Sequence, residues 1–198
     1  MKIGIIGAGG IGQAFASQVA KAGYEVIISN SREPSSLTEV VNRLGGNVTA
    51  GTVKQAAQAD VIFLAIPWNS LNTVMTSVPS WEGKIIIDPT NPILPGFRLA
   101  NLNGKTSSEV VADQAPGARV VKAFNTLTPH VLGAEPNQAG GKRVIFYSGN
   151  DTPANEIVGA IIERIGFAGV HLGRLAEGGK LQQFPGGPLP TLNLIRIG

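Results

Sequence analysis

The chain contains no cysteine and only two histidines among its 198 residues. Without thiols it cannot form disulfides, thiolate-ligated zinc sites or iron–sulfur clusters, and it has no cysteine nucleophile. His130 and His171 lie far apart and show none of the close spacings typical of metal ligands. We therefore expect no metal site.

Charge and long apolar runs are also scarce. Charged residues make up 15% of the chain, and the net charge of +3 is spread out, with Lys142-Arg143 as the one adjacent basic pair. Nucleic-acid or membrane binding requires a denser basic face, so neither partner is expected. No apolar run is long enough to span a bilayer. The apolar stretch near the N-terminus contains closely spaced glycines in place of the small-residue cleavage site of a signal peptide. We expect a cytoplasmic protein.

Valine and isoleucine, by contrast, gather in short runs that are almost continuously apolar. Such runs are typical of strands buried on both faces of a parallel sheet. We predict strands at Lys2–Ile6, Glu25–Ile28, Val61–Ile66, Lys84–Ile87, Arg119–Ala123, Arg143–Tyr147 and Gly169–Leu172.

Stretches with helical spacing of apolar residues separate these runs. They are Gly10–Ala22, Ser35–Leu44, Val53–Ala59, Ser70–Ser77, Ser107–Gln114 and Pro153–Ile165. The alternation predicts an α/β fold: a doubly wound, mostly parallel Rossmann sheet with helices on both faces and a short C-terminal extension. We expect one domain over residues 1–198, with residues 173–198 as a C-terminal tail.

Several residues have the properties of helix ends. Ser36 and Glu39 have the spacing of a capping box, in which the hydroxyl and the carboxylate bind the first amides of a helix. Asp151 precedes the last predicted helix and is a suitable N-terminal residue. Glycine tolerates the left-handed conformation that follows a helix, which predicts helix ends at Gly23, Gly45 and Gly166.

The segment Gly7-Ala8-Gly9-Gly10-Ile11-Gly12 matches the GxGxxG pattern between a strand and a helix. In that context Gly7 allows a tight turn, Gly9 lets the backbone approach a pyrophosphate, and Gly12 lets the helix pack closely on the strand. The phosphates are expected to bind the free amides at the positive end of the helix. The alternative is a glycine turn without a ligand.

The second predicted strand ends in Asn30-Ser31-Arg32 and lacks the acidic residue that binds the adenosine ribose in NAD sites. The Arg32 guanidinium can pair with a 2′-phosphate, and Asn30 and Ser31 can donate to its remaining oxygens. This pattern predicts NADP(H). In the alternative, Arg32 is a solvated turn residue and Glu33 binds the ribose.

Five segments together resemble the NADPH-dependent reductases of the deazaflavin coenzyme F-420, also called F-420-dependent NADP oxidoreductases. They are residues 1–32, AIPW (Ala65–Trp68), IDPTNP (Ile87–Pro92), KAFNTL (Lys122–Leu127) and LNLIR (Leu192–Arg196). This family shares its nucleotide domain with the cytoplasmic part of the STEAP ferric reductases. The resemblance covers nearly the whole chain and implies a single Rossmann domain with a small C-terminal extension.

The resemblance also implies roles for particular residues. The 2′-phosphate would lie against Ser31 and Arg32. The pyrophosphate would lie against Gly7, Gly9, Gly10, Ile11 and Gly12. The end of the third predicted strand would line the dinucleotide with Ile66, Pro67 and Trp68, and the residues near the nicotinamide would be Asn91, Pro92 and Asn125. From the residues alone, Trp68 is equally suited to a core position, and Asp88 and Asn91 to a turn.

The function that the resemblance implies is hydride transfer between NADP(H) and a flavin-like ring laid against the nicotinamide. The small-molecule acceptor would be coenzyme F-420 or a flavin such as FMN or FAD. Such transfer needs alignment more than acid–base groups, which agrees with the absence of a recognisable catalytic set. We predict no catalytic residue and expect Asn125 to contact the nicotinamide or the acceptor.

Two other functions remain open from the sequence. One is a non-catalytic NADPH sensor that acts through a protein partner. The other is a small-substrate dehydrogenase of the 6-phosphogluconate or pyrroline-carboxylate type, which shares the first motif but needs a helical second domain that we do not expect here. We also expect a homodimer, because a one-domain enzyme has to complete its second substrate pocket.

Overall fold

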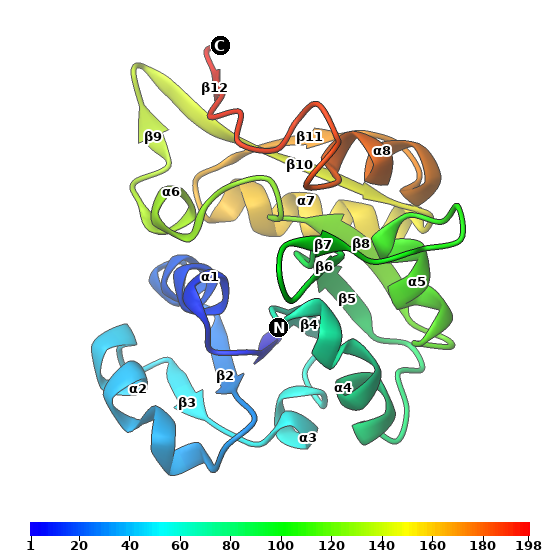
Figure 1. Cartoon of the computed structure of the whole chain (residues 1–198). Coiled ribbons are helices and arrows are strands. Elements are labelled where there is room, and N and C mark those ends of the chain that lie inside the picture. The colour runs from blue at the N-terminus through cyan, green and yellow to red at the C-terminus, as the bar shows by residue number, and fades with distance from the viewer.

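The apolar runs of the sequence form the central strands of one sheet in the computed structural model, which describes residues 1–198 (Figure 1). Across the sheet the strand order is β11-β10-β8-β5-β4-β1-β2-β3. The strands are β1 (Lys2–Ile6), β2 (Glu25–Ser29), β3 (Val48–Ala50), β4 (Val61–Leu64), β5 (Ile85–Asp88), β8 (Arg119–Ala123), β10 (Gly141–Gly149) and β11 (Ala168–His171).

The six strands from β3 to β8 run parallel, and the chain reverses its winding direction between β1 and β4. β10 is antiparallel to β8, with Tyr147 opposite Ala123, and β11 runs parallel to β10. The predicted doubly wound, mostly parallel Rossmann sheet is therefore confirmed. Such sheets bind ligands outside the carboxyl ends of the strands at the point of reversal.

Helices cover both faces of the sheet (Figure 1). One face carries α1 (Gly10–Lys21), α2 (Thr38–Leu44), α6 (Pro129–Gly133) and α7 (Thr152–Arg164). The other carries α3 (Val53–Ala56), α4 (Leu71–Ser77), α5 (Ser107–Asp113) and α8 (Leu175–Gln182). None of these helices combines the length and apolar character required of a membrane-spanning segment.

Short elements join or extend this framework. Two 3-10 helices precede α2 and α4, namely η1 (Pro34–Leu37) and η2 (Trp68–Ser70). The loop after β5 contains a hairpin of β6 (Ile93–Leu94) and β7 (Arg98–Leu99). The two strands that pair with β10 outside the main sheet are β9 (Asn137–Gln138) and β12 (Ile195–Arg196).

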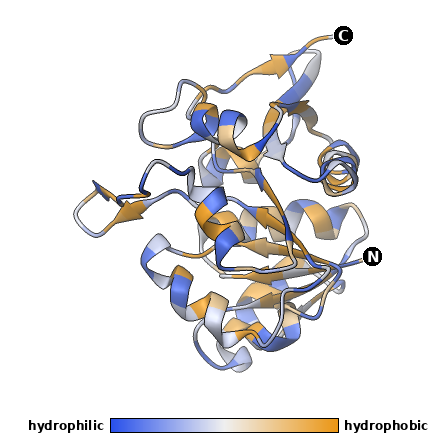
Figure 2. Ribbon diagram, turned by 90° about the vertical axis from the view of Figure 1, so that its right-hand side faces the viewer, coloured by the Kyte–Doolittle hydropathy of each residue, from blue (hydrophilic) through white to orange (hydrophobic).

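Alternate residues of each central strand enter different cores. Ile5 and Phe63 belong to the core under α1, whereas their neighbours Ile6 and Leu64 belong to the core under α3 and α4. This double burial explains why the strands read as continuous apolar runs. Figure 2 shows the same arrangement as orange strands at the centre of the molecule.

Three phenylalanines fasten α1 to the sheet. The rings of Phe15 and Phe63 stack with centroids 3.8 Å apart, and Phe124 meets both rings edge-on. All three side chains are fully buried. This cluster holds the start of α1 above the carboxyl ends of β1 and β4.

The helix-end predictions are partly confirmed. The Asp151 carboxylate accepts a hydrogen bond from the amide of Ala154 at the start of α7, as expected. The capping box at Ser36 and Glu39 is wrong, because a 3-10 turn begins at Pro34 and α2 starts only at Thr38. Capping boxes occur instead at Thr52–Gln55 and Thr106–Glu109. Gly23, Gly45 and Gly166 have positive backbone φ angles just after α1, α2 and α7, which confirms the three helix ends predicted there.

The segment from residue 173 onward contains regular structure that the sequence did not predict. Helix α8 packs beside β10 and α5, and β12 pairs with β10. Between them the chain returns to the carboxyl edge of the sheet, where the Thr191 amide donates to the Thr126 carbonyl over 2.8 Å.

Replacing Phe15 by alanine should lower the free energy of unfolding by about 3–5 kcal/mol, because it opens a cavity beside Phe63 and Phe124. Urea denaturation measures the loss. Lys21→Ala, an exposed change at the end of the same helix, should stay within about 0.5 kcal/mol of the parent. A loss below about 1 kcal/mol for Phe15→Ala would contradict the central role of the cluster.

Candidate functional site: two hollows at the carboxyl edge of the sheet

The glycine loop makes a sharp turn between β1 and α1. Gly7 has a φ of 108°, and its amide donates to the Ser29 carbonyl over 2.9 Å. A Cβ on Gly7 would lie 2.0 Å from the Ala65 carbonyl oxygen, and one on Gly12 would lie 1.9 Å from the Gly7 carbonyl oxygen. Only glycine therefore fits at either position.

The space in front of Gly9 is open. A Cβ built on Gly9 would meet no atom within 4 Å. Gly9 is the N-cap of α1, and neither a capping side chain nor an acidic residue in the first turn occupies the helix start. The first amides of α1 therefore remain available. The loop thus fits a pyrophosphate, which would take the place of the missing cap.

The end of β2 presents Ser31 and Arg32 on the surface. The Asn30 side chain shapes this turn: its oxygen accepts from the Arg32 amide over 2.9 Å, and its nitrogen donates to the Ser36 hydroxyl over 3.0 Å. Ser31 and Arg32 make no side-chain hydrogen bond or ion pair within the protein. The Arg32 guanidinium is therefore free to bind an anion, whereas the Asn30 amide is engaged in holding the turn.

These segments enclose a first hollow of about 430 Å³, which we call the adenosine hollow. Of the predicted site residues, those that line it are Gly7, Gly9, Asn30, Ser31, Arg32, Ile66 and Pro67. Its apolar wall is Leu37, Val40, Val53 and Val74. Glu33, the alternative ribose ligand, does not line it.

The structure places Trp68 elsewhere than predicted. The chain turns at Pro67 into η2, and the half-buried Trp68 side chain lines a separate hollow with Leu94, Leu102 and Lys105. Trp68 is thus not brought together with the other predicted site residues. Gly10, Gly12 and Pro92 line neither the adenosine hollow nor the one described next, although Gly10 lies beside Pro129 at the boundary between them.

A second hollow of about 260 Å³, which we call the nicotinamide hollow, lies on the other side of the glycine loop. It contains the predicted residues Ile11, Asn91 and Asn125. Its remaining walls come from the ends of β5 and β8 and from the C-terminal segment, at Pro89, Ile93, Thr126, Leu127, Thr128, Pro129, Phe184, Pro190 and Thr191. None of its lining residues is titratable.

Asn125 and Asn91 are bound to each other. The Asn125 side-chain nitrogen donates to the Asn91 side-chain oxygen over 3.0 Å, and the Asn91 nitrogen donates to the Asn125 carbonyl over 3.3 Å. These bonds join the loops that follow β5 and β8. The two asparagines therefore fix the distance across the base of the nicotinamide hollow.

A buried ion pair lies below these loops. The Lys122 ammonium and the Asp88 carboxylate are both fully buried, 3.6 Å apart. Lys122 also donates to the Thr90 carbonyl, and Asp88 accepts from the Thr90 amide and the Ser108 hydroxyl. Burial lowers the pKa of Lys122, and the charge of Asp88 opposes that shift. The pair fixes the turn that carries Asn91. This agrees with the interpretation from the sequence in which Asp88 stabilises a turn.

Sequence reasoning missed several residues of the two hollows. Gln13 lines the adenosine hollow, donates to the Ala8 carbonyl over 2.6 Å and accepts from the Arg43 guanidinium. Its polarity on an otherwise apolar stretch of α1 was the available signal. Phe184, Pro190 and Thr191 carried no signal, because a turn-rich tail does not show where it returns to the sheet.

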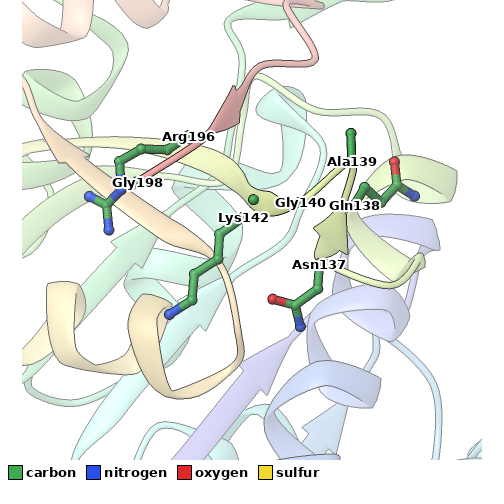
Figure 3. Close-up of a pocket in the computed structure, with 8 residues that line it drawn as sticks. Asn137, Gln138, Ala139, Gly140, Lys142, Arg196 and Gly198 are labelled. Carbon is green, nitrogen blue, oxygen red and sulfur yellow. The ribbon is translucent and has the colours of Figure 1, made fainter.

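Figure 3 shows another hollow, of about 530 Å³, beside the β9–β10 turn and β12. Its cationic residues, Lys142 and Arg196, lie 3.5 Å and 3.3 Å from the carboxylate oxygens of Glu163. Burial acts to raise the pKa of Glu163, but the hydrogen bond from the Gly169 amide and the charges of Arg196 and Lys142 lower it overall. Since these cations already have a counter-ion and lie away from the glycine loop, we do not place the functional site there. No group of three or more potential ligands for a metal ion is present.

The strand order and the adjoining hollows at the switch point define the class of protein: a Rossmann-type dinucleotide-binding domain. Residues 2–92, a little under half of the chain, match the family described as NADP oxidoreductase, coenzyme F420-dependent, and the chain is similar to this family over that segment. The matched segment runs from β1 through Pro92. The dinucleotide of the family is NADP(H).

The similarity to other proteins extends over most of the chain. A hypothetical protein from Sinorhizobium meliloti is 47% identical, with a TM-score of 0.93 and coverage of 99% of this chain and 96% of that one. A candidate F420-dependent NADP-reductase from Arthrobacter sp. FB24 is 26% identical, with a TM-score of 0.77 and coverage of 92% and 90%. The metalloreductase STEAP3 of Rattus norvegicus is 27% identical over 96% of this chain, which spans only 37% of STEAP3.

Replacing Lys122 by methionine should lower the free energy of unfolding by about 3–5 kcal/mol, because Asp88 is left as an unpaired buried charge. The double variant Lys122→Met/Asp88→Asn removes both charges and should regain at least half of that loss. Denaturant titration of both proteins tests this expectation. Equal losses in the single and double variants would show that the pairing of charges is not what matters at this position.

Proposed function

We propose that this protein is an NADPH-dependent reductase that transfers a hydride to a flavin-like ring, either coenzyme F-420 or a flavin. The match to the NADP oxidoreductase family supports NADP(H) as the dinucleotide. The geometry supports different roles for the two hollows, with one binding the adenosine end and the other the reacting ring. The adenosine hollow holds the 2′-phosphate at Arg32 and Ser31. The nicotinamide hollow then orients the reacting ring against the acceptor.

One observation carries the choice of acceptor: the nicotinamide hollow has no titratable side chain in its lining. Reduction of a carbonyl or an imine is assisted by a positioned proton donor near the atom that receives the electrons. A flavin or deazaflavin ring spreads the new electron pair over its own heteroatoms and exchanges protons with water. Alignment alone is then sufficient, as in other cofactor-to-cofactor hydride transfers.

The reaction balances without a further reagent. Bound NADPH supplies one hydride, which is a proton with two electrons, to the oxidised acceptor and leaves as NADP⁺. The acceptor takes one more proton from water to reach its neutral reduced form. The protein has to bind both rings face to face and to exclude water from the space between them.

Mixing the protein anaerobically with NADPH and F-420, FMN, FAD or riboflavin should produce acceptor-dependent loss of the nicotinamide absorbance. Cyclohexanone and a cyclic imine serve as matched acceptors that need a proton donor, and they should react far more slowly. Stopped-flow absorbance gives both rates. Faster reduction of the ketone or imine, or no reaction with any flavin or deazaflavin, would contradict the proposal.

Arg32→Ala should raise the Kd of NADPH about tenfold or more, because it removes a charge-assisted contact to the 2′-phosphate. The Kd of NADH should not change, since NADH lacks that phosphate. Arg98→Ala, an exposed arginine of the β6–β7 hairpin, is the matched control. Titration calorimetry at low salt measures the Kd of both dinucleotides for the parent and the two variants, and equal weakening of NADPH and NADH by Arg32→Ala would count against Arg32 as the phosphate ligand.

A second candidate is a non-catalytic NADPH sensor that acts through a protein partner. The observation that favours it is the exposed apolar surface of the C-terminal segment, where Leu192, Leu194 and Ile197 are 41%, 44% and 74% exposed. A sensor would bind NADPH without reducing any acceptor.

The same apolar surface suits a two-fold contact between copies of this chain. Sedimentation of the protein with and without NADPH tests whether it forms this homodimer.

A further inference from the structure

Gln182, the last residue of α8, is fully buried in spite of its polar side chain. Its side-chain oxygen accepts from the Ser148 hydroxyl over 2.8 Å, and its nitrogen donates to the Phe146 carbonyl over 3.1 Å. The same nitrogen lies 3.4 Å from both the Lys122 carbonyl and the Asn125 side-chain oxygen. Gln182 is therefore anchored to β8 and β10 at once.

This anchoring presses the backbone of residue 182 against Asn125. The Asn125 side-chain nitrogen donates to the Gln182 carbonyl over 2.6 Å, in addition to its bond with Asn91. A backbone carbonyl can only accept, so the Asn125 amide cannot turn over without placing two oxygens 2.6 Å apart. The bond to residue 182 thus decides which end of the Asn125 amide faces which neighbour.

The fixed orientation leaves the Asn125 oxygen with spare capacity. Both hydrogens of its nitrogen are used, whereas its oxygen has two lone pairs and only the long contact to the Gln182 nitrogen. Asn125 lines the nicotinamide hollow. The polar atom that it can offer a ligand there is therefore a hydrogen-bond acceptor and not a donor.

We propose that Gln182 is a positioning residue: it orients the Asn125 amide so that its oxygen accepts a hydrogen bond from the carboxamide NH₂ of the nicotinamide. The inference rests on the proposed function, since it takes the nicotinamide to occupy this hollow. Through Gln182, helix α8 would contribute to binding of the dinucleotide, although α8 lies beyond the matched segment 2–92. It also selects among ligands, because a ring substituent without an N–H cannot make the bond.

The test uses binding, so that it does not depend on turnover. The probe is 3-acetylpyridine adenine dinucleotide phosphate, in which a methyl group replaces the carboxamide NH₂. The Kd of this analogue divided by the Kd of NADP⁺ should be about three to ten in the parent protein, the factor expected of one hydrogen bond. Asn125→Ala should reduce the ratio to about one.

Gln182→Met keeps the volume of the side chain but removes the hydrogen bonds that hold the carbonyl of residue 182 against Asn125, and should lower the ratio below the parent value. Gln183→Met is the matched control: its side chain makes only a 3.5 Å contact with the Pro185 carbonyl, and the parent ratio should remain. Should Gln182→Met not fold, Ser148→Ala removes one anchor of Gln182 and should give a ratio between those of the parent and Asn125→Ala.

The outcomes separate this inference from the proposed function. If the parent does not bind NADP⁺ at all, the proposed function fails. If it binds NADP⁺ and the analogue equally well, or if Gln182→Met and Ser148→Ala keep the parent ratio, only the inference fails. A structural role alone would weaken both ligands together and leave the ratio unchanged.

Discussion

The close approach of α1 to the glycine loop is the constraint on which the rest of the site depends. A side chain at Gly12 would collide with the Gly7 carbonyl, so the helix can start directly above the end of β1 only with glycine at that position. The Phe15–Phe63 stack then holds the helix against β4. Because the neighbouring strands run parallel, the ends of β2, β4, β5 and β8 meet at the same edge and surround the uncapped amides of α1.

The two hollows are stabilised in different ways. Apolar side chains and the Asn30 turn form the adenosine hollow, and the Arg32 guanidinium stays free of protein partners. The nicotinamide hollow lies over buried polar contacts instead: the Asp88–Lys122 pair under one loop and the Asn91–Asn125–Gln182 bonds across the base. The charged and amide side chains of this set are paired, although the buried hydroxyl of Thr90 beside them has no partner. Paired buried polar groups favour one geometry, because a displacement leaves a group unsatisfied. Such rigidity suits a site in which alignment replaces acid–base chemistry.

The sequence predicted most of the fold and several of the residues that line the two hollows. Continuous apolar runs predicted every strand from β1 to β11 of the main sheet except the three-residue β3, and GxGxxG predicted the sharp turn. The capping box at Ser36 was wrong because Pro34 starts a 3-10 turn. Trp68 lies away from the adenosine hollow because the chain turns at Pro67. Helix α8 was not predicted because Gly178 and Gly179 weaken the helical pattern of the sequence. In the structure these two glycines allow close contact with Ser148 and Thr106. Contacts between segments distant in the sequence, such as Asn125 with Gln182, leave no local signal.

A crystal structure of the protein grown with NADP⁺ tests most directly the claim that the two hollows form one dinucleotide site. We expect the pyrophosphate at the amides of Gly9–Ile11, the 2′-phosphate within hydrogen-bond distance of Arg32, and the nicotinamide between Ile11 and Asn125. A dinucleotide bound at any other surface, or with its adenosine in the hollow beside Asn125, would contradict the account.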